Sequence, residues 1–366
     1  MLNQPIVSRI IKKPVIKYSQ EVINMQNKKQ IIRNIIILLL LILITFIFIF
    51  KNYDFINTIK IIMKTDIKYL LLATITMLLY IIFESINIKN IIKSLGNHIP
   101  IINAIKYTFI GFFFSGITPG GSGGQPMEIY YMKKDNIPVT SSTIALLIEL
   151  ISFHTITIIC GLIGLIMNKQ LMTKELIWIF IIGLVLKLIV LTIMIISLFF
   201  KNISQLLINL TIKILHKFKY TNLNKLEKNL NESLIKYHES SIYIKHHKRI
   251  IVKSLLTVFF QVIMSYTIPY FIYRSFGLNE FSYLKILSIQ ALLFVTTSSL
   301  PLPGTVGISE NVFLKIYATV FTVTILPSAM ILSRGINYYL FMLISIVIVI
   351  LNSLPKNKKK YDIIKS

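Results

Sequence analysis

The chain has 366 residues, of which 55% are hydrophobic and 14% charged, with a mean hydropathy of +0.73 and a formal charge of +25. Because a water-soluble protein has about 25% charged residues, this composition excludes a soluble globular domain. The lysines lie between long apolar runs, so the positive charge indicates membrane topology and contact with anionic lipids, not a nucleic-acid groove.

Backbone inside a bilayer must be helical, because no water is present there to satisfy its polar groups. The predicted fold class is therefore all-α: a polytopic integral membrane bundle with about eight spanning helices, each formed by roughly 20 apolar residues. Spans are predicted at 34 to 50, 67 to 87, 141 to 167, 176 to 200, 251 to 273, 282 to 299, 311 to 326 and 328 to 352. The first span is followed by Lys51 and Asn52, not by a cleavage site, so it is expected to be retained.

Three basic segments set the expected orientation, since short loops rich in Lys and Arg stay cytoplasmic. Residues 1 to 33 carry seven Lys or Arg, the loop 201 to 250 carries ten, and the tail 355 to 366 carries five lysines. All three are cytoplasmic only if the apolar segment 100 to 118 enters the membrane and returns. We therefore expect a multi-pass cell-membrane protein with a re-entrant segment and both termini in the cytoplasm.

The loop 201 to 250 joins two membrane halves, 34 to 200 and 251 to 354, and contains leucines at helical spacing. This pattern predicts amphipathic helices, either lying on an anionic leaflet or packed as a hairpin against the bundle.

Two segments, 116 to 128 and 300 to 310, interrupt the apolar runs and resemble each other. Both contain Pro-Gly-x-x-Gly and lead to a glutamate, Glu128 in the first and Glu310 in the second. Proline removes a backbone donor and glycine permits positive φ, so each segment is expected to break a helix. Matching breaks in two halves are typical of transporters built from repeats, with the substrate site between the broken helices. The alternative is a pair of tight interhelical turns.

Backbone amides of the first break are candidates for an anion nest that binds a lipid phosphate. The candidate lipid-binding residues of the two breaks are Pro119, Gly120, Gly121, Gly123, Gly124, Gln125, Glu128, Pro303, Gly304, Gly307 and Glu310.

Ionisable residues within predicted spans are the other candidates, since charges in a membrane usually face the bundle interior. Glu149 and Lys187 are expected to pair, as a structural salt bridge or as lipid contacts. Arg334 either snorkels to the interface or binds a phosphate. His154 and Cys160 are expected to be ordinary buried residues. No metal-binding or nucleotide motif is found, so no metal, cofactor or catalytic residue is predicted.

The segments Pro119-Gly-Gly-Ser-Gly-Gly-Gln-Pro126 and Pro303-Gly-Thr-Val-Gly-Ile-Ser-Glu310, with Arg334 and Tyr338, resemble the transmembrane domain of the lysylphosphatidylglycerol synthetase/flippase family. The resemblance covers nearly the whole chain. It implies movement of lysylphosphatidylglycerol from the inner to the outer leaflet, which contributes to resistance against cationic antimicrobial peptides. Because the chain ends at Ser366, the family's soluble C-terminal synthase domain is expected to be absent.

The leading hypothesis is thus a lipid translocase whose partner is an anionic phospholipid, phosphatidylglycerol or its lysyl ester, with a separate synthase as a further partner. The glycine amides and Lys187 or Arg334 would hold the phosphate, and Glu128 and Glu310 would face a cationic headgroup. One alternative is a phosphatidylglycerol lysyltransferase that uses lysyl-tRNA, although no catalytic constellation is found for it. Another is a carrier of a glycan or polyisoprenoid lipid.

Overall fold

The computed structural model describes residues 53 to 200 and 237 to 353, apart from 240, 299 and 301, together with scattered residues between 33 and 47. The predictions for 1 to 33, most of 34 to 50, the amphipathic helices of the 201 to 250 loop and the tail 355 to 366 fall outside this part of the chain. Within it every regular element is helical, which confirms the all-α membrane fold.

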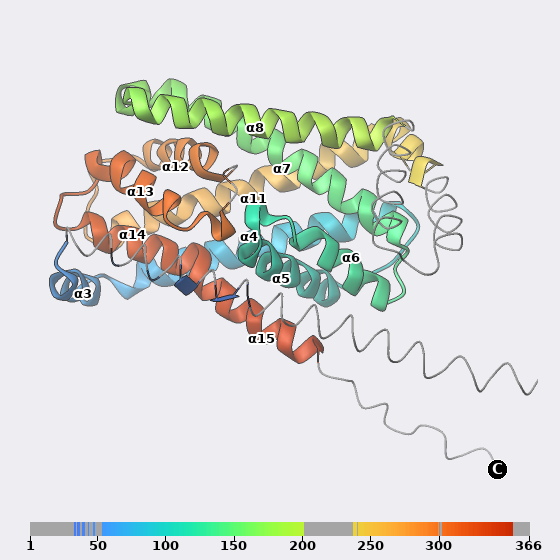
Figure 1. Ribbon diagram of the computed structural model, residues 1–366, viewed down its shortest axis with the longest axis horizontal. Helices are drawn as coiled ribbons and strands as arrows, with labels where there is room; N and C mark the ends of the chain where they lie inside the picture. Colours follow the sequence, from blue (N-terminus) through green and yellow to red (C-terminus); the bar gives the residue numbers. More distant parts are fainter. Residues whose placement is uncertain are drawn as a thin grey trace, which may run out of the picture.

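Among the described residues, five helices are long and apolar enough to span a membrane: α4 (Ile67–Ser94), α7 (Val139–Met167), α8 (Lys174–Phe199), α11 (Lys248–Ser275) and the continuous segment Leu326–Asn352. This segment comprises α14 (Leu326–Arg334), a π-helix (Gly335–Leu340) and α15 (Phe341–Ser353). The long helices run side by side along the horizontal axis of Figure 1. α8 forms one outer face, where many of its large apolar side chains are exposed, as expected for contact with lipid.

Two short helical hairpins lie among these long helices. The first consists of α5 (Ile101–Ile117), the 3₁₀ turn η1 (Pro119–Gly121) and α6 (Gly124–Lys134). The second consists of α12 (Tyr283–Ser298), the 3₁₀ turn η3 (Pro303–Thr305) and α13 (Ile308–Ile316). Each hairpin therefore has a Pro-Gly turn at its tip, and Figure 1 shows the two hairpins in opposite halves of the molecule.

The second hairpin accounts for a difference from the expected eight spans. Segments 282 to 299 and 311 to 326 were predicted to cross the membrane, but they supply the arms of this hairpin. α13 has nine residues, only about 14 Å at 1.5 Å per residue, and is followed by a 3₁₀ turn at Tyr317–Thr319. Hydropathy cannot distinguish such buried arms from spans, because both are apolar.

Side chains cap the amino ends of three helices. Asp54 and Asp66 cap the amino ends of α3 (Phe55–Met63) and α4, where each carboxylate accepts a backbone N–H. A 3₁₀ turn, Lys169–Leu171, connects α7 to α8, and Thr173 caps α8 by accepting the N–H of Leu176.

The element order reveals an inverted repeat. A long helix, a short helix, a Pro-Gly turn, a short helix and a long helix follow one another from α4 to α7 and again from α11 to α15. The leading helices α4 and α11 pack together extensively. They are antiparallel, because the N–H of Asp66 at the start of α4 donates to the carbonyl of Ser275 at the end of α11 at 2.9 Å. At their other ends Asn87 Nδ2 donates to Ser254 Oγ at 3.1 Å.

Glycines allow α12 to pack closely against α7 and α8. A Cβ on Gly164 would lie 2.5 Å from the carbonyl oxygen of Ser288, and one on Gly183 would lie 2.4 Å from that of Val295. Both obstacles are backbone atoms of α12, which cannot rotate away as a side chain can.

Replacing Gly164 by Ala should therefore lower the free energy of unfolding by about 1–3 kcal/mol, the usual cost of overpacking. Gly335→Ala is the matched control, because a Cβ there meets open space and helical alanine stabilises by roughly 0.5–1 kcal/mol. Thermal unfolding of the purified protein in one detergent would measure both. Equal stability of the two variants would contradict the close packing.

Candidate functional site

The two Pro-Gly turns contact each other. η1 contacts η3, and Tyr338 Oη of the π-helix donates a hydrogen bond to the carbonyl of Gly116, at the end of α5, at 3.0 Å. Gly120 has φ of 60° and Gly304 has φ of 56°, a conformation that favours glycine. The interpretation as simple interhelical turns is thus incomplete, because the tips of both hairpins form one junction.

A cavity of about 290 Å³ lies at this junction, and residues of both turns line it: Gly120 and Gly121 from the first, Gly304 and Thr305 from the second. The cavity is at mid-depth of the long helices. Its lining residue Tyr80 is the fourteenth of the 28 residues of α4, and Phe153 is the fifteenth of the 29 residues of α7. Broken helices that meet at the midplane are where repeat-built transporters bind their substrates.

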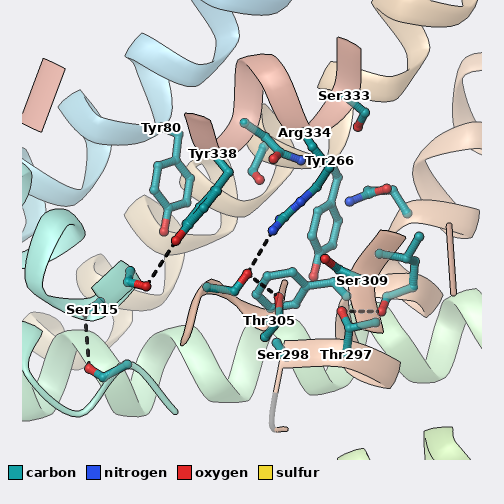
Figure 2. Close-up of a pocket in the computed structure, with 18 of the residues that line it drawn as sticks. Tyr80, Ser115, Tyr266, Thr297, Ser298, Thr305, Ser309, Ser333, Arg334 and Tyr338 are labelled. Atoms are coloured by element: carbon teal, nitrogen blue, oxygen red, sulfur yellow. Dashed lines mark hydrogen bonds between the residues drawn. The ribbon is translucent and has the colours of Figure 1, made fainter. Parts of the chain in front are cut away.

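Arg334 is the cationic residue of this cavity. Its Nε donates to Glu310 Oε1 at 2.8 Å, and its Nη2 donates to the carbonyl of Gly304 at 2.8 Å. The guanidinium also lies over the ring of Tyr338, 4.7 Å from the centroid. The side chains of Arg334 and Glu310 are 12% and 2% exposed, so Arg334 does not snorkel to the interface. In Figure 2 the guanidinium points from α14 toward the second turn.

Glu310 organises the second turn. Its Oε2 accepts the N–H of Gly307 at 2.7 Å and the hydroxyl of Ser309 at 3.0 Å, while Oε1 faces Arg334 and the hydroxyl of Tyr339. Gly307 has φ of 88° and begins α13. This carboxylate therefore caps α13 and at the same time fixes the position of Arg334.

Hydroxyl and amide groups complete the polar lining. Figure 2 shows the labelled side chains Tyr80, Ser115, Tyr266, Thr297, Ser298, Thr305, Ser309 and Ser333 around Arg334 and Tyr338. Within the described part of the chain, three buried atoms of the lining make no hydrogen bond: Tyr266 Oη, Ser298 Oγ and Asn337 Oδ1. Buried polar atoms are normally paired, so these atoms are available to water or a ligand.

Of the residues predicted from the sequence, Gly120, Gly121, Gly304 and Arg334 line the cavity. Pro303 is buried at the second turn, whereas Pro119 is exposed and Gln125 is half-buried near the start of α6. Glu128 and Glu149 are buried elsewhere in the first half. Sequence reasoning missed the lining tyrosines, although Tyr80 and Tyr266 are polar groups inside apolar runs.

Two of the glycine amides predicted to form the anion nest are already used within the turn. The N–H of Gly121 already donates to the carbonyl of Thr118, and that of Gly123 donates to Thr118 Oγ1 at 2.9 Å. Gly124 instead permits close packing of α6 on α5, since a Cβ there would lie 2.0 Å from Ser115 Oγ. The glycines of this motif serve mainly the turn and the helix contact.

The predicted pairing of Glu149 with Lys187 is wrong. Lys187 is 2% exposed and its Nζ lies 3.4 Å from Thr157 Oγ1, two turns along α7 from Glu149. The ring centroids of Phe294 and Phe153 lie 5.0 and 6.0 Å from the same Nζ. These two rings line the cavity, so Lys187 lies behind its wall.

The fold and the site define a class of protein: a multi-pass helical membrane protein with an inverted repeat and, between two broken hairpins, a cavity that contains a buried arginine. The profile of the family described as lysylphosphatidylglycerol synthase TM region matches residues 31 to 345, and the chain belongs to this family.

A curated relative is the UPF0104 membrane protein PH1989 of Pyrococcus horikoshii, 28% identical over 79 residues. That match covers 21% of this chain and 24% of the relative, so the chain spans about a quarter of the relative's length.

Proposed function

We propose that the protein moves an anionic phospholipid, phosphatidylglycerol or its lysyl ester, between the leaflets of the cell membrane. The observation that carries this proposal is the arrangement of both Pro-Gly turns around one mid-depth cavity that contains Arg334. A cavity of 290 Å³ is at the lower end of ligand pockets, which measure about 300–1,000 Å³. That size suits a headgroup whose acyl chains remain in the bilayer.

The chemistry of the cavity matches a phosphodiester. Guanidinium has five N–H donors, and Arg334 uses Nε and Nη2 for the hydrogen bonds to Glu310 and Gly304. The other donors, with the unpaired hydroxyls of Tyr266 and Ser298, can hold phosphate oxygens. Glu310, whose two oxygens already accept from Arg334, Gly307, Ser309 and Tyr339, holds the guanidinium in position for the phosphate. Movement of the two turns apart would open this site. In this proposal the basic loops and both termini lie in the cytoplasm.

Proteoliposomes that contain labelled phosphatidylglycerol or its lysyl ester test this proposal. We expect wild type to equilibrate the label between leaflets and Arg334→Gln to slow this movement roughly 10- to 100-fold, because a charge-assisted hydrogen bond contributes about 1.5–3 kcal/mol. The exposed Arg249 provides the matched control Arg249→Gln, which should behave as wild type.

Two outcomes would count against the lipid or the site. Equal movement in wild type and Arg334→Gln would remove the cavity from the mechanism. Movement of a labelled polyisoprenoid or glycan lipid, with phosphatidylglycerol left in place, would redirect the proposal to another cargo.

A further inference from the structure

A second polar cluster, none of whose carboxyls lines the cavity, contains three glutamates from three different helices. Glu84 is on α4, Glu128 on α6 and Glu149 on α7, and Gln261 of α11 lies among them. Glu128 and Glu149 are 3% and 6% exposed, Gln261 is fully buried, and Glu84 is half-buried. Gln261 Nε2 donates to Glu84 Oε2 at 3.1 Å, which ties the cluster to the central pair of antiparallel helices.

The cluster has no basic partner among the described residues. Their ion pairs are Lys106 with Asp135, Lys315 with Glu175 and Arg334 with Glu310, and none involves these three glutamates.

The groups that interact with these carboxyls are acidic or neutral. Glu128 interacts electrostatically with Glu84 and Glu149. Tyr80 of α4 interacts with Glu84 and Gln261, and α5 contributes Gly111. Buried carboxylates without a counter-charge are costly, and such groups take up protons instead.

Two acceptor atoms in the cluster lack a donor. Glu128 Oε2 and Gln261 Oε1 are buried and make no hydrogen bond within the described part of the chain. An ionised carboxylate can only accept hydrogen bonds, whereas a protonated one also donates. Added protons would therefore supply the missing donors. A metal ion fits less well, since no three acidic, histidine or cysteine side chains of the described residues are arranged to hold one.

The packing of Glu128 connects this cluster to the cavity. A Cβ on Gly111 would lie 2.0 Å from Glu128 Oε1, so the absence of a side chain on α5 makes room for the carboxyl. Glu128 is one helical turn after Gly124, and α6 begins directly beyond the Pro-Gly turn whose Gly120 and Gly121 line the cavity. A force on Glu128 thus acts on the hairpin that closes one side of the cavity.

We propose that Glu84, Glu128 and Glu149 form a proton-binding site that controls the packing of the first hairpin. With protons bound, the carboxyls carry no charge, and α6 stays against α5 and α7. When protons leave, the like charges repel in a medium of low dielectric constant and push α6 outward. Because the three groups interact, their protons belong to the cluster and not to one residue. The coupling of this site to lipid movement rests on the function proposed above, whereas proton binding itself does not.

Infrared difference spectroscopy of the purified full chain in nanodiscs tests proton binding. We expect a protonated-carboxyl band that titrates with pH in wild type and is reduced in Glu128→Gln and in the double variant Glu84→Gln/Glu149→Gln. Glu280→Gln is the control, because Glu280 is exposed in the turn before α12. Gel filtration verifies that each variant is folded. An identical titrating band in wild type, Glu128→Gln and the double variant would overturn the site, as would a band that responds to Na⁺ but not to pH.

Proteoliposomes with labelled phosphatidylglycerol and an imposed pH gradient test the coupling. We expect the gradient to change the rate of lipid movement in wild type and to lose this effect in Glu128→Gln. Lipid movement in wild type that ignores the gradient would overturn the coupling while leaving the lipid function intact. A titrating band without any lipid movement would support the proton site and contradict the lipid function, so the two failures are distinguishable.

Discussion

Replacing either Glu310 or Arg334 should destabilise the protein more than replacing both. The Nε of Arg334 and Oε1 of Glu310 are 2.8 Å apart, and both side chains are largely buried. Removal of one partner from a buried ion pair leaves an uncompensated charge, which costs about 3–5 kcal/mol. Glu310→Gln should be the milder and Glu310→Ala the more severe single variant, because Ala also removes the hydrogen bonds to Gly307 and Ser309.

A double-mutant cycle measures this prediction. Thermal unfolding of wild type, Glu310→Gln, Arg334→Gln and the double variant yields the coupling free energy, which for residues in contact is about 0.5–3 kcal/mol. The double variant should recover part of the stability of wild type but no lipid movement, because the guanidinium is gone. Glu175→Gln is the control, since its ion pair with Lys315 is exposed and contributes only about 0–1 kcal/mol. Additive losses of the two single variants would show that the ion pair is not coupled.

Local chemistry made the broken helices predictable from the sequence. Proline and glycine determine backbone conformation wherever they occur, and Gly120 and Gly304 have the left-handed φ that a Pro-Gly turn favours. The sequence left the role of Arg334 open, because a cation near the end of an apolar run can either snorkel to the interface or face the bundle interior. Its partner is Glu310, which the sequence analysis expected to face a cationic headgroup.

Tertiary geometry accounts for what the sequence did not reveal. Whether Lys187 faces Glu149 or Thr157 depends on how α8 is rotated and shifted along α7, and no local pattern records that relation. Glu84 is a second example. The sequence shows it as an ionisable residue in a predicted span, but not that Glu128 and Glu149 of other helices lie near it. The sequence did not distinguish the arms of the second hairpin from membrane spans, because both are apolar.

Replacing Gly304 by Ala should disrupt the junction of the two turns. A Cβ at this position would lie 2.1 Å from Tyr338 Oη and 2.4 Å from Tyr338 Cζ. Tyr338 cannot move away freely, because its hydroxyl donates to Gly116 of the first hairpin and its ring stacks on Arg334. The added methyl group therefore either breaks the hydrogen bond between the halves or shifts the turn that holds Arg334. We expect a loss of stability of about 2–5 kcal/mol, from left-handed backbone strain and overpacking together, and a loss of lipid movement.

The inverted repeat itself provides the matched control for this variant. Gly120 occupies the equivalent position in the first turn with nearly the same φ, but a Cβ there has no heavy atom within 4 Å. Gly120→Ala thus carries the backbone strain without the collision, and should cost only about 1–2 kcal/mol. Unfolding temperatures and lipid movement of the two variants, measured side by side, separate strain from contact. If Gly120→Ala and Gly304→Ala lose stability equally, the contact between Gly304 and Tyr338 does not hold the two halves together, and another contact must close the cavity.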